Sequence, residues 1–398
     1  MRISTAYSYD NGINTLLQRQ DGMSALQNQM TTGKRVNKAS DDPAAAARAE
    51  RALASVSRGE ADQRTIDASR SVMTQTESAL GDAGGLLQNA RALLVEAGNP
   101  TLNDADRKAL AAQLQSLRGQ LLGIANQDNG AGTYVFGGQG STQQPFVDTP
   151  SGVKFTTTSG ALRTEAGTDL PLTSDGNAAW MTARTGNGVF VTSAGPGVAG
   201  ATIDTGSVTD PSALTGAAYT LAFTVTAGVT TYAVMKNGAA TAVTAAPYVS
   251  GQAIAVDGMA LTVSGTPVSG NQFQVAASTA TLSVFDSIDK AIGDLSAIGR
   301  TGPQMAQANG ENIRNLDSVM ANLQAARGAA GDVLNDIDSQ KGRLDARKLV
   351  GTTDRSNAED VDMVHAISEF QSRQNGYDAA LKSYALVQHL SLFQYVNG

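Results

Sequence analysis

Apolar residues recur at helical spacing near both ends of this 398-residue chain, whereas the middle lacks that spacing. The first helix candidate ends at Gly33, and its apolar residues share one stripe of a helix: Ile13, Leu16, Met23, Leu26 and Met30. The last helix candidate carries a single heptad register: Met363, Ile367, Phe370, Tyr377, Leu381 and Tyr384. Because neither stripe has a partner nearby in sequence, each must pair with the other or with further copies of the chain to be buried.

The segments just inside the first stripe also predict helices. One helix is expected from Pro43 towards Gly98, with a weak point at the Gly84-Gly85 pair. Asn103 or Asp104 is expected to cap the next helix, whose leucines alternate four and three positions apart: Leu110, Leu114, Leu117, Leu121 and Ile124. Two antiparallel helices joined by a short turn are the expected result.

On the other side of the chain, helical spacing returns over residues 284–295 and resumes from about Glu311 through Leu344. Between the two helical parts, Thr, Gly, Ala and Val dominate, and YTLAFTVTAGVTTYAVM alternates apolar and small polar residues around a glycine turn, which predicts a β-hairpin. The sequence therefore predicts a mainly α fold with an inserted β domain: a terminal coiled-coil region of residues 1–40 and 355–398, a helical bundle of residues 41–140 and 282–354, and an antiparallel β domain of residues 141–281.

The stretch TTGKRVNKASDDPAAAARAE, residues 31–50, contains a Gly-Lys pair that suggests a phosphate-binding loop. Such a loop needs a glycine five residues before Gly33 and a Ser or Thr after Lys34, but the chain has Asn28 and Arg35 there. We therefore interpret Gly33 as the left-handed residue that ends a helix, with Lys34 and Arg35 solvated beside the negative helix end.

The acidic pair in the same stretch has a similar explanation. Pro43 suits the first position of a helix and forces the preceding residue into an extended conformation, so Asp42 is the expected N-cap, helped by Ser40 or Asp41. The pair Glu359-Asp360 is likewise expected at a helix start, where acidic residues stabilise the helix dipole. Both acidic pairs are thus interpreted as markers of helix starts and not as parts of a chemical site.

Composition argues against several classes of function. The net charge is -7 and Lys and Arg are dispersed, which excludes an electrostatic footprint for nucleic acid or an anionic membrane. The chain has no cysteine, only His365 and His389 as histidines, and no G-x-S-x-G elbow, so we expect no enzyme activity, metal site or cofactor. No signal-peptide or membrane-spanning run is expected, and any export must use another route.

Several motifs resemble those of the bacterial flagellin superfamily. TTGKRVNKASDDPAAAA, preceded by LQNQM and the start MRIST, resembles its N-terminal signature. Within it, the MRIST opening, the YVFGGQG turn and the SLFQYV ending are similar to hook-associated proteins at the hook-filament junction rather than to filament flagellin. SGQAIAVDGMALTVSGTPVSGNQFQVAAS resembles the segment by which they leave their β domain, although Asn271 replaces an expected acidic residue. The resemblance covers roughly residues 1–147 and 250–398.

This resemblance implies a flagellin-like fold, with terminal helices in an axial coiled-coil layer, inner helices in a rod-like bundle and an outward β domain. It implies flagellar type III export, terminal segments that order on assembly, and a cytoplasmic export chaperone. Copies of the chain would form a short layer between the first hook-associated protein and flagellin. The assembly interface would comprise the two stripes with Leu390, Leu392 and Phe393, and the hinge would comprise Gly33, Lys34, Arg35, Ser40, Asp41, Asp42 and Pro43.

Three other functions fit parts of the sequence. A filament flagellin would be distinguished by its copy number and its C-terminal tail. An adhesive or carbohydrate-binding β insert is an alternative to a plain surface domain, because a fold alone does not fix function. An enzyme in the middle domain is disfavoured as a zinc enzyme, because no histidine precedes His365.

Overall fold

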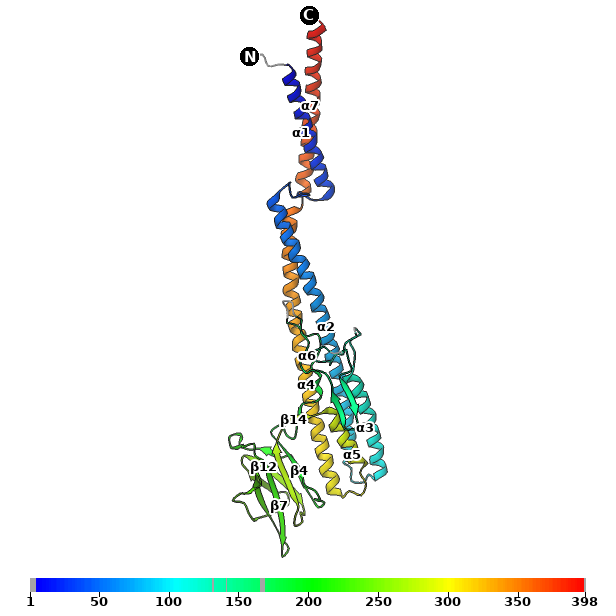
Figure 1. Ribbon diagram of the computed structural model, residues 1–398, viewed down its shortest axis with the longest axis vertical. Helices are drawn as coiled ribbons and strands as arrows, with labels where there is room; N and C mark the ends of the chain where they lie inside the picture. The colour runs from blue at the N-terminus through cyan, green and yellow to red at the C-terminus, as the bar shows by residue number, and fades with distance from the viewer. Residues whose placement is uncertain (1–4, 131, 141, 165–168, 397–398) are drawn as a thin grey trace. The chain divides into compact units, whose positions relative to one another are not determined.

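The computed structural model describes residues 5–130, 132–140, 142–164 and 169–396 (Figure 1). The chain forms two compact units, which we call the terminal unit, Met1–Arg64 with Gln340–Gly398, and the central unit, Thr65–Ser339. The long helices are α1 (Thr5–Thr32), α2 (Pro43–Ala97), α3 (Asp104–Ala125), α5 (Val284–Ser296), α6 (Gly302–Glu359) and α7 (Met363–Val396). The predicted mainly helical fold with a separate antiparallel β domain is confirmed.

Two helix predictions differ from the structure. The Gly84-Gly85 pair does not interrupt α2, because the neighbouring Leu80 and Leu87 are almost fully buried and hold the helix by packing. Helix α6 begins at Gly302 rather than near Glu311. Its first turns bury the polar Gln307, so an apolar periodicity could not reveal them.

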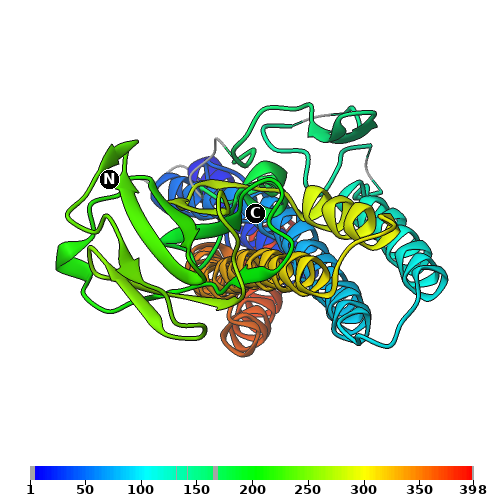
Figure 2. The same cartoon turned by 90° about the horizontal axis from the view of Figure 1, so that it is seen from below.

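A first hydrophobic core lies among the helices of the central unit. Helices α3 and α5 lie side by side, and Figures 1 and 2 show them beside the C-terminal half of α2 and the N-terminal half of α6. The predicted leucines Leu87, Leu114 and Leu121 are fully buried in this core. Each such side chain contributes roughly 1.5–3 kcal/mol relative to an exposed position. Asn103 caps α3 with a complete capping box, as the prediction allowed.

The segment between α3 and the larger sheets also joins this core. It contains the hairpin of β1 (Phe146–Thr149) and β2 (Gly152–Phe155) and the short helix α4 (Gly176–Trp180). The Trp180 ring stacks on Phe285 with centroids 5.8 Å apart, and the Phe146 ring lies 5.8 Å from the same phenylalanine. The predicted β insert was drawn from residue 141, but these residues belong to the helical core. We therefore propose that the outer β domain begins near Thr185.

A buried arginine holds this hairpin on the helices. Arg118 of α3 donates to both carboxylate oxygens of Asp148 at 2.6 and 2.8 Å, and its Nε lies 2.5 Å from a carboxylate oxygen of Asp289 on α5. The hydrogen bonds to Asp148 raise the pKa of Arg118 despite its burial. The arginine therefore joins α3, the β1–β2 hairpin and α5.

The β domain has a second core and two larger antiparallel sheets. The six-stranded sheet has the order β10-β8-β7-β13-β4 with β9 beside β8, and the four-stranded sheet has the order β11-β12-β5 with β6 beside β12. The strands are β4 (Phe190–Ala194), β5 (Ala201–Ile203), β6 (Ser207–Val208), β7 (Tyr219–Thr226), β8 (Val229–Lys236), β9 (Ala239–Ala240), β10 (Ala246–Pro247), β11 (Ala253–Val256), β12 (Met259–Gly265) and β13 (Gln272–Ala277).

The predicted hairpin is confirmed as β7 and β8. Its turn residues Ala227 and Gly228 have φ angles of 49° and 81°, the conformation that a two-residue hairpin turn of type I′ requires. A small sheet of β3 (Ala183–Arg184) and β14 (Ala280–Leu282) lies where the chain enters and leaves the β domain.

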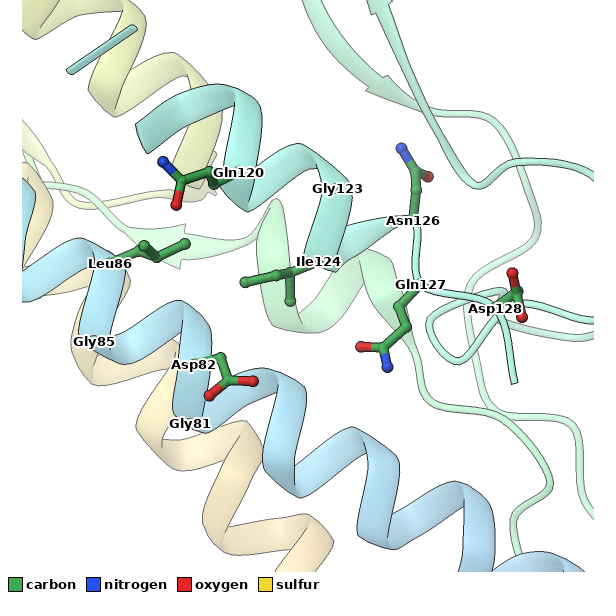
Figure 3. A pocket seen from close by; sticks show the side chains of 10 residues that line it. All are labelled: Gly81, Asp82, Gly85, Leu86, Gln120, Gly123, Ile124, Asn126, Gln127 and Asp128. Carbon is green, nitrogen blue, oxygen red and sulfur yellow. The ribbon is translucent and has the colours of Figure 1, made fainter. Parts of the chain in front are cut away.

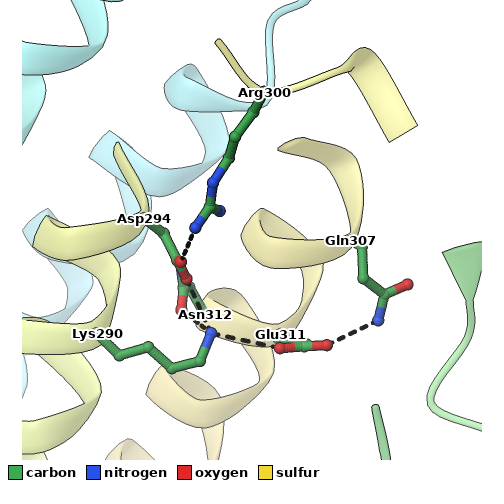
Figure 4. A network of polar contacts seen from close by, with 6 residues as sticks. All are labelled: Lys290, Asp294, Arg300, Gln307, Glu311 and Asn312. Carbon is green, nitrogen blue, oxygen red and sulfur yellow. Dashed lines mark hydrogen bonds and ion pairs between the residues drawn. The ribbon is translucent and has the colours of Figure 1, made fainter. Parts of the chain in front are cut away.

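A polar network connects the β domain with the helices of the central unit (Figure 4). Gln307 accepts a hydrogen bond from the Ile203 backbone N–H at 2.9 Å and donates to Glu311 at 2.8 Å. The network continues through Lys290 to Asp294, whose carboxylate also accepts from Arg300 and Asn312. Burial alone would raise the pKa of Asp294, but the bond from Lys290 and these further donors lower it overall.

Candidate assembly site

The terminal unit contains a joint at which two helices end and two begin. We define the joint as residues 33–42 and 359–362, which link α1 to α2 and α6 to α7. Lys34 and Asp360 form an antiparallel β-bridge between the two segments. The Arg35 N–H donates to the Glu359 carbonyl at 2.7 Å, and the Val361 N–H donates to the Gly33 carbonyl at 3.0 Å. Backbone hydrogen bonds therefore tie the two crossings of the chain together.

Gly33 ends α1, as predicted. Its φ of +71° is the left-handed conformation that costs other residues energy, and a Cβ at this position would meet no atom within 4 Å. Glycine is needed here for its backbone conformation alone, and not for space.

Lys34 and Arg35 keep 38% and 46% of their side-chain surface accessible, in agreement with the prediction that they are solvated, and both also take part in the joint. The Lys34 ammonium lies 3.2 Å from the Glu359 carboxylate, which also pairs with Arg355 at 2.7 Å. Arg35 donates to the Ala358 carbonyl at 2.9 Å and to Asp42 at 3.1 Å. Glu359 and Ala358 lie more than 300 residues away in sequence, so no local pattern identifies these two partners.

Asp42 caps α2, as predicted. Its side chain accepts from the Ala45 N–H at 2.9 Å, and Pro43 is the first residue of the helix. The Ala45 N–H and the Arg35 guanidinium hold the pKa of Asp42 below its usual value. Asp41 closes the joint instead of helping this cap, because its carboxylate accepts from the backbone N–H groups of residues 37 and 38. Ser40 is exposed in the turn between residue 38 and Asp41.

The segment that links α6 to α7 differs from the prediction of a helix start at Glu359-Asp360. Glu359 is the last residue of α6, so the pair Glu359-Asp360 lies at a helix end and not at a helix start. Asp362 caps the following helix, α7, by accepting from the N–H groups of Val364 and His365 at 3.0 and 3.1 Å. Asp362 directly precedes the apolar run from Met363, which is a sequence signal for an N-cap that the analysis missed.

Helices α1 and α7 pair with each other within the terminal unit. The rings of Tyr9 and Tyr384 meet edge to face with centroids 5.8 Å apart. Arg373 donates to the Gly22 carbonyl at 3.2 Å, and a Cβ at Gly22 would lie 2.7 Å from its guanidinium. Arg19 covers Gly376 in the same way, with a separation of 2.8 Å. Two reciprocal arginine-on-glycine contacts therefore fix an antiparallel register, which the heptad pattern could not reveal.

This pairing buries only part of the two predicted stripes. Leu26 is buried, while six residues are half-buried: Leu16, Met23, Met30, Phe370, Tyr377 and Tyr384. Four residues remain exposed, with 40–44% of their surface accessible: Ile13, Met363, Ile367 and Leu381. The side chains of Leu390, Leu392 and Phe393 lie outside the described part of the structure. That all these residues form an assembly interface stays a prediction.

Further exposed apolar residues on the pair were missed by the sequence analysis. Leu17 is 52% exposed and Val364 is 81% exposed. Leu17 lies next to a predicted stripe residue, and Val364 follows the cap of α7, so both lie just off the heptad positions. Isolated exposed apolar residues are ordinary, but a series of them along a helix pair marks an interaction surface.

The described residues offer little for other chemistry. Among them, no group of three or more His, Asp or Glu side chains could hold a metal ion. No helix in the described part of the chain is long and apolar enough to cross a membrane.

Comparison with known proteins agrees with this geometry. The sequence profile of the bacterial flagellin N-terminal helical region matches residues 3–141, which include α1, the first half of the joint, α2 and α3. Residues 3–141 are therefore similar to the N-terminal helical region of bacterial flagellins.

The chain is also similar to flagellar hook-associated protein 3. It is 37% identical to that protein of Salmonella typhimurium over 156 residues, which are 38% of this chain and 48% of the relative. The match therefore spans about half the length of the curated relative. A phase 1 flagellin of Salmonella naestved is 30% identical over 122 residues, which are 31% of this chain but 24% of that flagellin.

The solved structures extend this similarity to the fold. The crystal structure of hook-associated protein 3 from Legionella pneumophila superposes with a TM-score of 0.71 at 26% sequence identity. The superposition covers 76% of this chain and 97% of the Legionella chain. The similarity to hook-associated protein 3 thus extends beyond the N-terminal residues 3–141.

Proposed function

We propose that this chain is a structural protein of the bacterial flagellum, located outside the cell. Copies of it form a short adaptor layer that joins the hook, through the first hook-associated protein, to the flagellin filament. The observation that carries the proposal is the similarity to the Legionella hook-associated protein 3, which extends over 97% of that chain. The match to phase 1 flagellin covers 24% of that protein, so a filament flagellin is the weaker alternative.

In this function, the exposed residues of the α1/α7 pair pack against neighbouring subunits. The predicted stripe residues that can gain burial in this way are Ile13, Met363, Ile367 and Leu381, because 40–44% of the surface of each is accessible in the single chain. Burial of apolar surface contributes roughly 25 cal/mol per Å² and drives such association. The joint sets the direction in which α1 and α7 leave the adjoining helices, and the Asp42 cap and Pro43 fix the start of α2.

Export follows from the same proposal. The chain would leave the cell through the flagellar type III system, with a cytoplasmic chaperone covering the apolar C-terminal region until secretion. The absence of cysteine suits this route, because no disulfide has to form or break on the way. The adaptor function involves no catalytic step, cofactor, nucleic acid or membrane.

The test is deletion of the gene in its source bacterium, followed by electron microscopy of the cell surface and an assay of the medium for flagellin. The proposal expects hooks without filaments and flagellin lost to the medium, with both defects corrected by the wild-type gene. Intact filaments and normal swimming after deletion would contradict it. Loss of the filament protein itself, with no flagellin in cells or medium, would identify the chain as a flagellin.

A further inference from the structure

A groove runs between α2 and α6 within the terminal unit. It has a volume of about 840 Å³, and three arginines from both helices line it with one acidic residue, Asp354: Arg48, Arg51 and Arg347. Its floor is made of small residues, among which Ala52 and Ala358 are buried. Val350 lies at its rim with 60% of its surface exposed. We call this feature the arginine groove.

The three arginines lack acidic partners in the described part of the chain. Arg48 and Arg51 direct their Nε atoms to carbonyls of their own helix, at 3.4 and 3.1 Å. None of the three has a carboxylate oxygen within 4.0 Å among the described residues, unlike Arg91 and Arg327, which pair with acidic residues across helices. The guanidinium charge in the groove is therefore available to a molecule from outside.

This part of the chain is basic within an acidic protein. Residues 43–64 and 340–359 contain nine Lys or Arg and six Asp or Glu, a formal charge of +3, whereas the whole chain carries -7. The remaining residues therefore carry -10. A second copy of this chain presents an acidic surface to a basic groove, and such complementarity steers association and fixes its register.

The central unit contains a second groove, whose carboxylate and amide oxygens could accept hydrogen bonds from arginine side chains. It lies between α2 and α3 and has a volume of about 1020 Å³. Two acidic residues, Asp82 and Asp128, line it together with amide, glycine and apolar residues. Figure 3 shows Asp82, Ile124 and Gln127 pointing into it. The Asp82 carboxylate has no hydrogen-bond or ion-pair partner among the described residues. A Cβ at Gly85 or Gly123 would meet nothing within 4 Å, which leaves room for long side chains.

We propose that the arginine groove of one copy binds the Asp82 groove of a second copy. Arg48, Arg51 and Arg347 supply planar donors, and Asp82 with the Gln127 amide supplies acceptors, so charge-assisted hydrogen bonds form between the copies. The two grooves are different surfaces, and the contact is therefore head-to-tail, as a ring or helical layer requires. This inference rests on the proposed assembly of the chain at the junction.

A charge swap tests the contact in cells that carry the full-length gene. Arg51→Glu and Asp82→Arg, each alone, place like charges in the contact and should reduce the fraction of filament-bearing cells roughly tenfold, the effect of about 1.4 kcal/mol of binding. The double variant restores opposite charges and should recover most of that loss. Arg51→Glu combined with Glu96→Arg is the matched control, because Glu96 is an exposed acidic residue of α2 outside the groove, and it should not recover.

A second measurement uses the absence of cysteine in the chain. A variant with Arg51→Cys and Asp82→Cys should give chain-to-chain products with a short bismaleimide in purified flagella, whereas Arg51→Cys with Glu96→Cys should not. Circular dichroism and the secreted amount of each variant confirm that folding and export are intact.

The outcomes separate this inference from the proposed function. If wild-type chain is present at the hook end but neither single variant loses filaments, or the double variant fails to recover, the Asp82 contact is wrong and the junction role stands. If wild-type chain is absent from the hook end, both proposals fail. Recovery in the double variant with the expected cross-link supports the contact.

Discussion

The helical core of the central unit and the α1/α7 pair of the terminal unit are built from similar apolar residues but bury them to different degrees. Leu87, Leu114 and Leu121 in the core have no exposed surface. On the pair, Leu17 is 52% exposed and Ile13 is 43% exposed. Both regions have helical periodicity, so the difference lies in the number of partner elements within the chain.

This difference shows which region buries its apolar side chains fully within one chain. In the core, α3, α5 and the β1–β2 hairpin supply further surfaces beside α2 and α6, and aromatic residues such as Trp180 fill the space between them. In the pair, two helices cover one another on one side, which leaves apolar side chains for another molecule to cover. A row of apolar side chains that stays exposed in the single chain indicates an assembly surface more directly than one exposed residue does.

The largest expected effect compares matched leucines in the two regions. Leu121→Ala removes a fully buried side chain and should lower the free energy of unfolding by about 2–5 kcal/mol. Leu17→Ala changes a half-exposed residue and should change it by less than about 0.5 kcal/mol. Urea denaturation of the isolated chain, followed by circular dichroism, measures both. Equal losses would show that the pair is as complete as the core.

A smaller effect is expected from two glycines with opposite roles. Gly33→Ala forces alanine into a left-handed conformation and should destabilise the chain by about 1 kcal/mol. Gly84 lies inside α2 with no atom within 4 Å of an added Cβ, so Gly84→Ala should stabilise it by roughly 0.5–1 kcal/mol. Thermal unfolding distinguishes the signs, and stabilisation by both substitutions would contradict the assignment of Gly33 as a helix end.

Pro43→Gly tests whether the joint matters for assembly beyond stability. Glycine at this position frees the backbone of the unfolded chain, which should reduce stability by about 0.4–1 kcal/mol while the bundle stays folded. Filament attachment should fall, because the start of α2 is no longer fixed. Counting filaments by electron microscopy measures this effect, with Pro43→Ala as the milder control. Normal filament retention in Pro43→Gly would refute the role of Pro43.

The smallest expected effect is a pH dependence at the Asp42 cap. Because the folded-state pKa of Asp42 is lowered, its ionised form contributes stability above the unfolded pKa of about 3.9, and this contribution disappears as pH falls through the lower folded pKa. Asp42→Asn keeps an acceptor without the charge, so its urea midpoint should depend less on pH than the wild type between about pH 6 and about pH 2. Parallel curves would exclude the charged cap.

Local patterns in the sequence predicted much of the fold. Heptad spacing identified α3 and the paired faces of α1 and α7, Gly33 and Pro43 marked helix boundaries, and the β7–β8 turn followed from its alternating flanks. Contacts between distant segments could not be predicted in this way. Trp180 looked like part of a β insert because its own neighbours carry no helical pattern, yet Phe285, far along the chain, buries it.

The candidate site was predictable to a similar extent. The stripe residues and the hinge motif were predicted from periodicity and resemblance, and their part in assembly stays a prediction. The Asp42 cap was predicted from the proline that follows it and is confirmed. The contacts of Lys34 with Glu359 and of Arg373 with Gly22 could not be predicted. Each joins two segments that are far apart in sequence, and their alignment is set only in the folded chain. Exposure of Leu17 likewise depends on which face α7 covers.

Site-directed labelling of Ile13→Cys tests most directly whether the stripe is buried by assembly. The chain has no other cysteine, and Ile13 is 43% exposed in the single chain. A maleimide should label this cysteine readily in the secreted, unassembled chain and poorly in purified flagella, while Val229→Cys at the β7–β8 hairpin, 60% exposed, should label in both. Equal labelling of Ile13→Cys before and after assembly would contradict the account.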